Sequence, residues 1–421
     1  MGSIAYLSKR FAVQIKFIAA AVGFACATLP ANASSISSVV PSLWKGDKSA
    51  AVTFSFDDGF LDTFNNAVPY LTSSGLRSTQ YVVNSFNGIT WDGYTTDGTL
   101  TGSPLPYASS SVWAFAKQNG HEIASHTVNH TGLAPSSVGI VTTNGAVVQC
   151  TDPTYLTYQH GNQSWMDSEV HSSVQALNST LEQNTVALAF PGGLNTQEVR
   201  DCLKQDTSPY KILTARTSDA GINSSSPDFY NLMSEDVQTG TLTSQVDGWM
   251  DSAVAQGGWL ILMYHIVGPN NYKSTSDGSW YAYYTPTSEF QSQVDYAVSQ
   301  SKNIWVDTHG NVFKYIAERN AMFTSGAVNI TGPNAFTANA IGLDASIYNV
   351  RLTFAIRLSS DWSSNFAIVS QGGSACRQSV GTAADGTPFL FANVIPNGQT
   401  VSLTIPAAGD TTPACPALTN W

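Results

Sequence analysis

Two adjacent carboxylates, Asp57 and Asp58, stand where a predicted strand gives way to a predicted helix. Residues 50–56 alternate apolar and small polar side chains, as a strand does, and apolar residues recur at helical spacing from Phe60 to Leu71. α/β scaffolds display catalytic side chains at the carboxyl ends of strands. The pair is therefore a candidate for acid-base or metal chemistry. Capping of the following helix by either aspartate is the alternative.

A second group of candidate ligands lies in residues 121–130, which read His-Glu-Ile-Ala-Ser-His-Thr-Val-Asn-His. His126 and His130 are four residues apart, and in a helical turn this spacing puts both imidazoles on one face. Two His and one Asp bind a divalent ion while leaving positions open for water, which is typical of a catalytic metal site. The pattern predicts a metal ion shared with the aspartate pair.

Two other predicted strands end in residues that suit a substrate site. Tyr264 and His265 follow the apolar run of residues 259–263, and a core histidine is the alternative interpretation for His265. Pro191 and Gly192 form a turn in which glycine would let a substrate approach backbone amides closely. Both segments are expected at the same edge of the sheet as the aspartates.

These segments together resemble the polysaccharide deacetylases of carbohydrate esterase family 4, also called the NodB-homology family. Residues 53–59 (Thr-Phe-Ser-Phe-Asp-Asp-Gly) are similar to its first motif, 126–130 (His-Thr-Val-Asn-His) to its second and 262–265 (Leu-Met-Tyr-His) to its last. The resemblance spans residues 48–320. It implies a distorted (β/α) barrel that hydrolyses acetyl groups from sugars with a divalent metal, commonly Zn²⁺, with Co²⁺ or another divalent ion as the alternative.

The resemblance also implies a role for each matching residue. The metal ligands would be Asp58, His126 and His130. The catalytic acid and base would be His265 and Asp57, respectively. The substrate contacts would be Pro191, Gly192 and Tyr264, with the amide of Gly192 as a donor to the oxyanion.

The chain departs from the family in the third motif, which usually begins with an arginine that orients the base. Ala189 occupies the corresponding position in Leu188-Ala189-Phe190-Pro191-Gly192. Arg216, at the end of the next predicted strand, is the candidate replacement, and a surface arginine is the alternative. The fourth motif is not recognisable, and the nearby acids Asp236 and Asp247 receive no role.

Short apolar runs alternate with helical patterns after residue 56 and predict a parallel sheet of seven strands. At this length a closed or nearly closed barrel is favoured over an open sheet. The further strands are expected at 78–83, 122–125, 186–190, 212–215, 259–264 and 303–306. The further helices are expected at 111–118, 168–184, 197–205, 244–255, 288–301 and 312–319.

Two insertions, at 84–110 and 131–167, are expected to be loops at the rim of a substrate groove. Aromatic side chains in loops can stack on the apolar face of a pyranose. The candidates for this contact are Trp91, Tyr94, Trp165, Trp280 and Tyr281. Trp259 and Trp305 are expected in the core.

Composition divides the chain into four parts. A basic start, an apolar run from Phe17 to Leu29 and the sequence Ala31-Asn32-Ala33 predict a secretory signal peptide at 1–33, cleaved after Ala33. A linker at 34–47 and a catalytic barrel at 48–322 follow. Short β-branched runs separated by Gly, Asn, Asp and Pro predict a small all-β sandwich at 323–421.

Four cysteines follow the expected signal peptide, and in an oxidising compartment they are expected to pair. Cys150 with Cys202 and Cys376 with Cys415 is the economical pairing, because each pair then lies within one part of the chain.

The 421-residue chain carries a formal net charge of −11, which becomes −14 without the three basic residues of the signal peptide. Such a charge excludes nucleic acid and anionic membranes as favoured partners. We expect a secreted monomer, without a membrane span after cleavage, that acts on a polysaccharide or oligosaccharide. Its predicted activity is N-deacetylation of an N-acetylhexosamine polymer such as chitin. An O-acetyl xylan esterase using the same site and a catalytically silent carbohydrate-binding protein are the alternatives.

Overall fold

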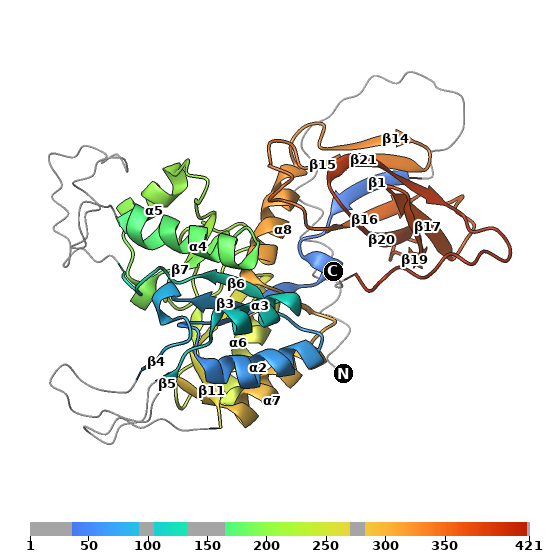
Figure 1. Ribbon diagram of the computed structural model, residues 1–421. Coiled ribbons are helices and arrows are strands. Elements are labelled where there is room, and N and C mark those ends of the chain that lie inside the picture. The colour runs from blue at the N-terminus through green and yellow to red at the C-terminus, as the bar shows by residue number, and fades with distance from the viewer. Residues whose placement is uncertain (1–35, 92–104, 133–164, 270–282, 419–421) are drawn as a thin grey trace, which may run out of the picture. The chain divides into compact units, whose positions relative to one another are not determined.

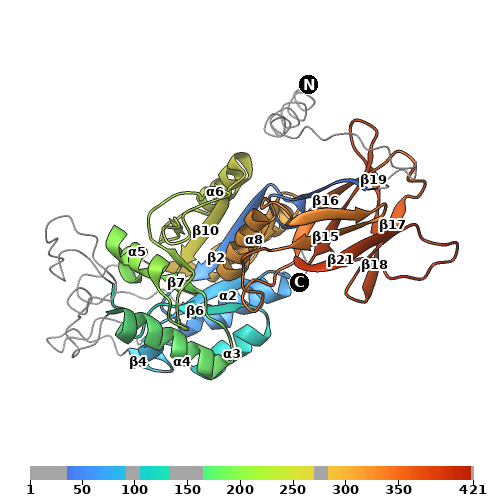
Figure 2. The same cartoon turned by 90° about the horizontal axis from the view of Figure 1, so that it is seen from above.

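The computed structural model describes residues 36–91, 105–132, 165–269 and 283–418, and these ranges belong to one compact unit (Figure 1). Helices surround a parallel sheet in one part of this unit, and antiparallel strands form the other, as Figure 2 also shows. Within the described ranges no helix is both long and apolar enough to cross a bilayer.

The parallel sheet contains the seven expected strands and one more. Its members are β2 (Ala50–Phe56), β3 (Ser78–Val82), β6 (Glu122–Ser125), β7 (Ala187–Ala189), β8 (Thr214–Arg216), β9 (Glu235–Asp236), β10 (Trp259–Tyr264) and β13 (Ile304–Val306). Their order is β8-β7-β6-β3-β2-β10-β9, and β13 pairs with the first residues of β2. The additional strand, β9, has only two residues, too few to show a hydrophobic period.

The sheet is curled but open, which corrects the expectation of a closed or nearly closed barrel. The edge strands β8 and β9 do not pair with each other. A single bridge, from Arg216 to Leu232, joins β8 to the chain that leads into β9. Because β9 is so short, it cannot present a second ladder to complete the ring. The expected distorted (β/α) architecture is nevertheless the observed one, with its parallel sheet curled into a half-barrel.

Helices cover the outer face of this sheet. They are α2 (Leu61–Ser73), α3 (Ser110–Gln118), α4 (Ser172–Leu181), α5 (Gln197–Gln205), α6 (Thr243–Gln256) and α7 (Thr287–Ser299). Helix α8 (His309–Ala321) packs on the other face, where Phe313 shares a buried cluster with Trp259 and Ile261 of β10. In α2 the buried face contains Phe64, Val68 and Leu71, the residues whose spacing predicted the helix. A π-helix, η4 (Met166–His171), precedes α4, and short 3₁₀ turns occur at η2 (Lys45–Asp47), η3 (Asn84–Phe86) and η5 (Pro191–Gly193).

The C-terminal part consists of two antiparallel sheets, as expected. The first has the order β1-β16-β20-β19, formed by β1 (Ile36–Pro41), β16 (Leu352–Leu358), β20 (Pro388–Val394) and β19 (Gly381–Thr382). The second has the order β14-β15-β21-β17-β18, formed by β14 (Val328–Gly332), β15 (Ala335–Asn339), β21 (Asn397–Thr404), β17 (Phe366–Gln371) and β18 (Ser374–Ser379). Small two-stranded sheets pair β4 (Thr90–Trp91) with β5 (Leu105–Pro106) and β11 (Ile266–Gly268) with β12 (Tyr284–Pro286).

Strand β1 comes from the segment that was expected to be a linker. It pairs antiparallel with β16, so residues at opposite ends of the chain share one sheet. The expected disulfide between Cys376 and Cys415 is present. Cys202 is also disulfide-bonded, and its expected partner Cys150 lies outside the described residues.

One hydrophobic core continues from the parallel sheet into the antiparallel sheets. Trp44, Trp305 and Phe313 belong to the same buried cluster as Phe336 and Phe354. Polar contacts reinforce this junction: Tyr315 Oη donates to the carbonyl of Ser42 (3.0 Å), Gly46 N donates to Thr353 Oγ1 (2.8 Å) and Val350 N donates to Glu318 Oε2 (3.2 Å). The segment after β1 therefore ties the two parts together.

Candidate functional site

Asp57 and Asp58 lie in the turn that follows β2, an interior strand that pairs with β3, β10 and β13. The backbone of Asp57 donates to the carbonyl of Tyr264 (2.9 Å), which holds the turn against β10. Asp58 has a φ of +69° and is followed by Gly59 at +82°. Helix α2 begins at Leu61 without a side-chain cap. Neither aspartate caps the helix, so the alternative reading of the pair is excluded.

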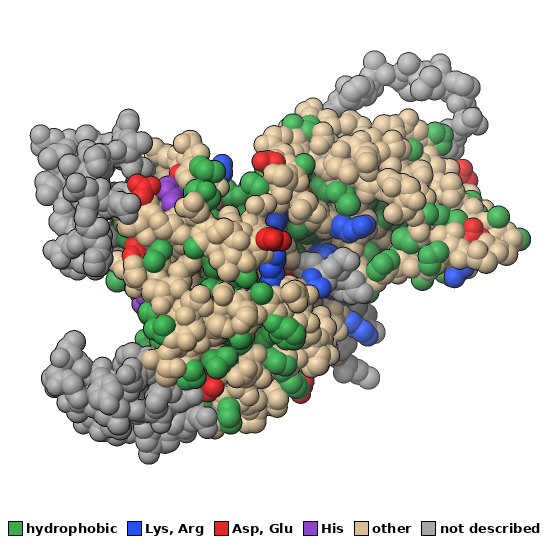
Figure 3. All heavy atoms as spheres, viewed as in Figure 1, with side chains coloured by type: hydrophobic (Ala, Val, Ile, Leu, Met, Phe, Trp, Pro, Cys, Tyr) green, Lys and Arg blue, Asp and Glu red, His purple; other side chains and the backbone are tan. Residues whose placement is uncertain are grey.

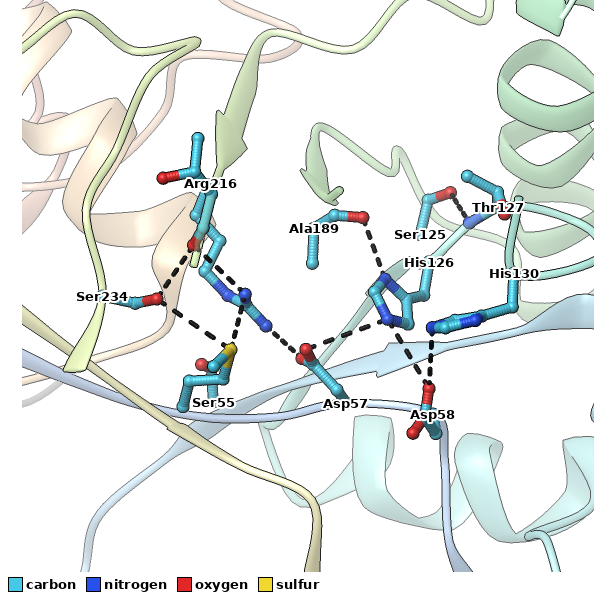
Figure 4. Close-up of polar contacts among 12 residues, drawn as sticks. Ser55, Asp57, Asp58, Ser125, His126, Thr127, His130, Ala189, Arg216 and Ser234 are labelled. Carbon is cyan, nitrogen blue, oxygen red and sulfur yellow. Dashed lines mark hydrogen bonds and ion pairs between the residues drawn. The ribbon is translucent and has the colours of Figure 1, made fainter. Parts of the chain in front are cut away.

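His126 and His130 follow β6, the second neighbour of β2 in the sheet, and their rings lie 4.8 Å apart (Figure 4). The segment between them is a loop and not the helical turn that the spacing suggested, because Thr127 and His130 have φ values of +68° and +59°. His126 Nδ1 lies 2.9 Å from the carbonyl of Ala189. A carbonyl can only accept, so Nδ1 carries the proton and the lone pair of Nε2 faces the carboxylates.

Asp58, His126 and His130 converge on one point (Figure 4). Asp58 Oδ1 is 3.3 Å from His130 Nε2 and 3.6 Å from His126 Nε2, and one ligand atom from each residue lies within 4.8 Å of the others. Oδ1 is buried and makes no hydrogen bond with the described residues. One carboxylate and two imidazoles form a donor set that suits Zn²⁺ or a similar divalent ion. The three residues therefore fit the metal that was expected.

The two neighbouring carboxylates have opposite electrostatic environments. Burial, together with the charge of Asp57, raises the pKa of Asp58 to about 8. Burial would also raise the pKa of Asp57, but Arg216, His126 and His265 outweigh it and lower that pKa to about 2. A bound cation would compensate the buried charge of Asp58, whereas Asp57 is already ionised at neutral pH.

Arg216 is buried beside Asp57, which excludes the surface arginine (Figure 4). Its Nη2 donates to Asp57 Oδ1, while Nη1 lies 3.0 Å from the sulfur of Met263. Arg216 on β8 is the register partner of Ala189 on β7. Its guanidinium therefore comes from the position beside the one where the family's arginine was expected. The contact is the one that an orienting role requires, and that role stays a prediction.

Three buried side chains near Arg216, those of Thr214, His309 and Tyr81, form a chain of hydrogen bonds. The guanidinium lies over the ring of Tyr81, 5.0 Å from its centroid. Thr214 Oγ1 donates to the carbonyl of Phe229 (3.0 Å), so it must accept from His309 Nε2 (2.7 Å), and His309 Nδ1 then accepts from Tyr81 Oη. Burial lowers the pKa of His309 to about 3, which keeps this chain neutral. No sequence motif pointed to Tyr81 on β3 or to His309 at the start of α8, because contacts between distant elements leave no local pattern.

His265 directly follows β10, as predicted, and is close enough to Asp57 and Asp236 for both carboxylates to affect its pKa. Burial lowers that pKa, while Asp57 and Asp236 act in the opposite direction. The ring lies 4.4 Å from that of Tyr283, and its buried Nδ1 has no hydrogen-bond partner among the described residues. Asp236, which received no role from the sequence, lies on β9 beside Met263 of β10. Of the two carboxylates, Asp57 has the larger effect on the pKa of His265.

The Pro191–Gly193 turn follows β7 and lies close to the histidine loop. A Cβ atom on Gly132 would come within 2.5 Å of the Pro191 carbonyl, and one on Gly193 within 1.9 Å of Ser218 Oγ. Gly192 has a φ of +60°, a conformation that favours glycine. The turn therefore packs tightly at the strand ends, where the sequence placed it.

Two expected substrate contacts are wrong. Tyr264 is fully buried, and its hydroxyl donates to Gln293 Oε1 (2.8 Å) among the packed side chains beneath the helices. Side chains alternate along a strand, and since Met263 points inward to Arg216, Tyr264 must point outward. Trp165 is also fully buried, with Nε1 donating to the carbonyl of Thr131 (2.8 Å).

The other aromatic predictions have mixed outcomes. Trp259 and Trp305 are buried in the core, which confirms the expectation. Tyr94, Trp280, Tyr281 and the side chain of Trp91 lie outside the described residues. Phe86 and Tyr107 were not predicted, yet their ring centroids lie 4.6 Å apart, with the rings tilted by 44°, and Phe86 stacks on His130 at 6.4 Å.

A family model described as polysaccharide deacetylase matches residues 45–210. The chain contains a polysaccharide deacetylase domain. The match includes the expected metal ligands, Asp57 and the Pro191–Gly193 turn of the deacetylase domain. It ends before Arg216 and His265, so their assignment depends on the geometry described above.

Several solved structures are similar to the deacetylase domain, all with low identity. A Streptococcus pyogenes deacetylase in complex with acetate is 21% identical with a TM-score of 0.30 and covers 43% of this chain and 62% of that one. A de-N-acetylase from Aggregatibacter actinomycetemcomitans is 19% identical, with a TM-score of 0.35, over 47% and 74% of the two chains. A family 4 acetyl xylan esterase from Clostridium thermocellum, with a cobalt ion, is 13% identical, with a TM-score of 0.34, over 62% and 90%.

A curated gellan lyase from a Bacillus species is 24% identical over 388 residues. The aligned part covers 87% of this chain but only 13% of the lyase.

Proposed function

We propose that this protein removes N-acetyl groups from a polymer of N-acetylhexosamine, such as chitin or a related glycan. Water and the acetamido group would yield acetate and a free amine on the sugar. The observation that carries the proposal is the pair of adjacent buried carboxylates with opposed pKa shifts, one facing two histidines and the other an arginine. Titratable neighbours whose environments separate their pKa values indicate an assignment of different roles.

Asp57 is the proposed general base. Its pKa of about 2 keeps it ionised at neutral pH, and Arg216 holds one of its oxygens, leaving Oδ2 on the side of His126. Asp57 Oδ2 lies 3.8 Å from His126 Nε2, so the base adjoins the proposed metal ligands. Proton transfer by a positioned side chain typically contributes about 10²–10⁴-fold to the rate.

Asp58, His126 and His130 would hold the divalent ion. When bound there, such an ion polarises an acetyl carbonyl and lowers the pKa of water from about 15.7 towards about 7. The amide of Gly192 is the proposed donor to the developing oxyanion. His265 is the proposed acid for the leaving nitrogen, since Asp57 and Asp236 partly offset the lowering of its pKa by burial. An amine is a poor leaving group unless it is protonated, so an acid at this position is our reason for preferring an N-acetyl substrate to an O-acetyl one.

We also propose that the protein is secreted, with cleavage after Ala33. A surface of low charge density supports an extracellular, neutral glycan as substrate. Charged side chains are sparse on the face shown in Figure 3, in keeping with a charged content of 11%. Sequencing the N-terminus of the exported protein tests this proposal, and a chain that retains residues 1–33 would contradict it.

The test of activity is acetate release by residues 34–421 from chitin oligosaccharides, acetylated xylan and peptidoglycan, with Zn²⁺ added and then chelated. We expect metal-dependent release from an amino sugar and none from xylan. Release from xylan alone would instead establish an O-acetyl esterase. No release from any of these substrates and no bound metal would favour a silent binding protein.

Asp57→Asn is the matched variant for this assay. It keeps the size of the side chain but removes the base, so it should bind Zn²⁺ like the parent protein and lose at least about 10²-fold in turnover. A variant with parental turnover would assign the base to another residue.

A further inference from the structure

Glu169 is a buried acid that no motif pointed to. It lies on the π-helix η4, and only 2% of its surface is exposed. Both carboxylate oxygens bind one residue of the histidine loop: Oε2 accepts from Asn129 N (2.8 Å) and Oε1 accepts from Asn129 Nδ2 (2.9 Å). A buried carboxylate is tolerated when hydrogen bonds satisfy it, and these two bonds do so.

The residue that Glu169 binds directly precedes the ligand His130. His130 has a φ of +59°, and Thr127, at the other end of the loop, has a φ of +68°. Such left-handed conformations are unfavourable for residues other than glycine and persist only where the surroundings hold them. Thr127 Oγ1 accepts from Thr131 N (3.1 Å), and the Glu169 contacts secure the middle of the loop. The loop between the two histidines is thus held from outside the metal site.

Glu169 reaches the metal site only through Asn129, the residue next to His130. Its effect on the ligand is therefore on the orientation of the loop, as for a carboxylate that hydrogen-bonds behind a metal-binding residue. Partners of this kind, outside the ligands themselves, typically change metal affinity by about 10–100-fold.

We propose that Glu169 is a positioning residue for the metal: through Asn129 it holds His130 in the ligating conformation. The inference rests on the metal site of the proposed function but does not depend on the substrate. The proposal gives the π-helix η4 a function, because η4 places Glu169 against the loop that carries His130. Irregular helical turns of this kind are frequent at functional sites.

The test is a calorimetric titration of the metal-free protein, residues 34–421, with Zn²⁺, comparing the parent with Glu169→Gln. Glutamine has one acceptor oxygen, so one of the two Asn129 donors loses its partner. We expect zinc affinity to fall by about 10–100-fold. Parental affinity in a folded variant would overturn the proposal, whatever its activity.

Glu122→Gln is the control for the loss of a buried, hydrogen-bonded carboxylate. Glu122 Oε2 also accepts from one backbone amide, Gly310 N (2.9 Å), and one side chain, Thr79 Oγ1 (2.8 Å). It lies at the opposite end of β6 from His126, roughly 13 Å away along the strand. This variant should lose thermal stability without losing zinc affinity. An equal loss of zinc affinity in both variants would show that Glu169→Gln weakens zinc binding only by destabilising the fold, which would contradict the proposal.

Asn129→Ala keeps the test decisive if Glu169→Gln fails to fold. Asn129 is exposed, and alanine retains its backbone amide, so only the 2.9 Å contact is lost. We expect a smaller fall in zinc affinity than for Glu169→Gln, with unchanged thermal stability of the metal-free protein. Unchanged zinc affinity in this variant would also contradict the proposal. If the parent binds Zn²⁺ but releases no acetate, the proposed function fails, and a fall in zinc affinity in Glu169→Gln would still support the role of Glu169.

Discussion

Arg216 reaches Asp57 across the interior of the half-barrel, from a strand four positions away in the sheet. Its guanidinium also contacts Met263 and the face of Tyr81. Its register partner on the neighbouring strand is Ala189, the position where the family's arginine was expected. At this scale, Arg216 is the largest of the three neighbouring charges that lower the pKa of the proposed base.

Arg216→Ala should reduce turnover by about 10²-fold or more, the size of a typical acid-base effect. The sign of its pH effect follows from the contact: Arg216 lowers the pKa of Asp57, so its removal raises that pKa. Asp57 must be ionised to act as a base, and the acid limb of kcat/KM should therefore move to higher pH. The measurement is a pH profile of kcat/KM for both proteins.

Arg216→Lys provides the comparison, since it retains a positive charge without the planar fork. Its acid limb should lie between those of the parent and the alanine variant. An acid limb that stays in place after Arg216→Ala would show that Arg216 does not control the base.

At the scale of elements, the π-helix η4 is joined to α5 by an ion triad. His171 Nε2 lies 2.8 Å from Asp206 Oδ2, and Nδ1 lies 3.0 Å from Asp167 Oδ1. Burial lowers the pKa of His171, but the two carboxylates outweigh it and the net shift is upward. The pKa of Asp206 is lowered in turn, although burial alone would raise it. This triad anchors the helix that carries Glu169.

His171→Gln should destabilise the protein mainly at acidic to neutral pH. Because the pKa of His171 is raised on folding, its contribution is complete below about pH 6.5, the unfolded value, and is lost as pH rises through the folded value. Towards about pH 4 the contribution of Asp206 begins to fade. Denaturant unfolding of parent and variant at pH 5.5 and pH 9 measures this difference, and an equal effect at both pH values would contradict it.

At the scale of the whole molecule, the antiparallel sheets belong to the same core as the half-barrel. Trp44 and Phe313 are at most 2% exposed and share a buried cluster with Phe354 of β16. Arg319 extends the junction, with Nη1 donating to the carbonyl of Leu43 (2.7 Å). A boundary drawn at residue 322 therefore passes through a continuous core.

A chain limited to residues 48–322 should be much less stable than one of residues 36–421. Its apolar side chains at the junction would be exposed to water, at about 25 cal/mol per Å² of apolar surface. Thermal unfolding and light scattering should show a lower midpoint and aggregation. Equal midpoints for the two chains would instead show that the half-barrel folds independently.

Much of the half-barrel and of the candidate site could be predicted from the sequence. The hydrophobic periods of strands and helices are local, so residues 50–71 by themselves predicted β2 and α2. The carboxyl ends of parallel strands then necessarily lie at one edge of the sheet. Asp57, Asp58 and the two histidines therefore came together as expected. The alternation of side chains along β10 would also have predicted that Tyr264 lies on the outer face, opposite to Met263.

The remaining features were decided by contacts between segments distant in the chain. Pairing of β1 with β16, the register that puts Arg216 beside Ala189, and the clamp of Glu169 on Asn129 join residues 27 to more than 300 positions apart. Nothing in a local pattern specifies which buried arginine or glutamate will meet which loop. The sequence by itself determined the chemistry at each strand end; only the tertiary structure decided which charges hold those groups in place, because burial and register arise when the strands assemble.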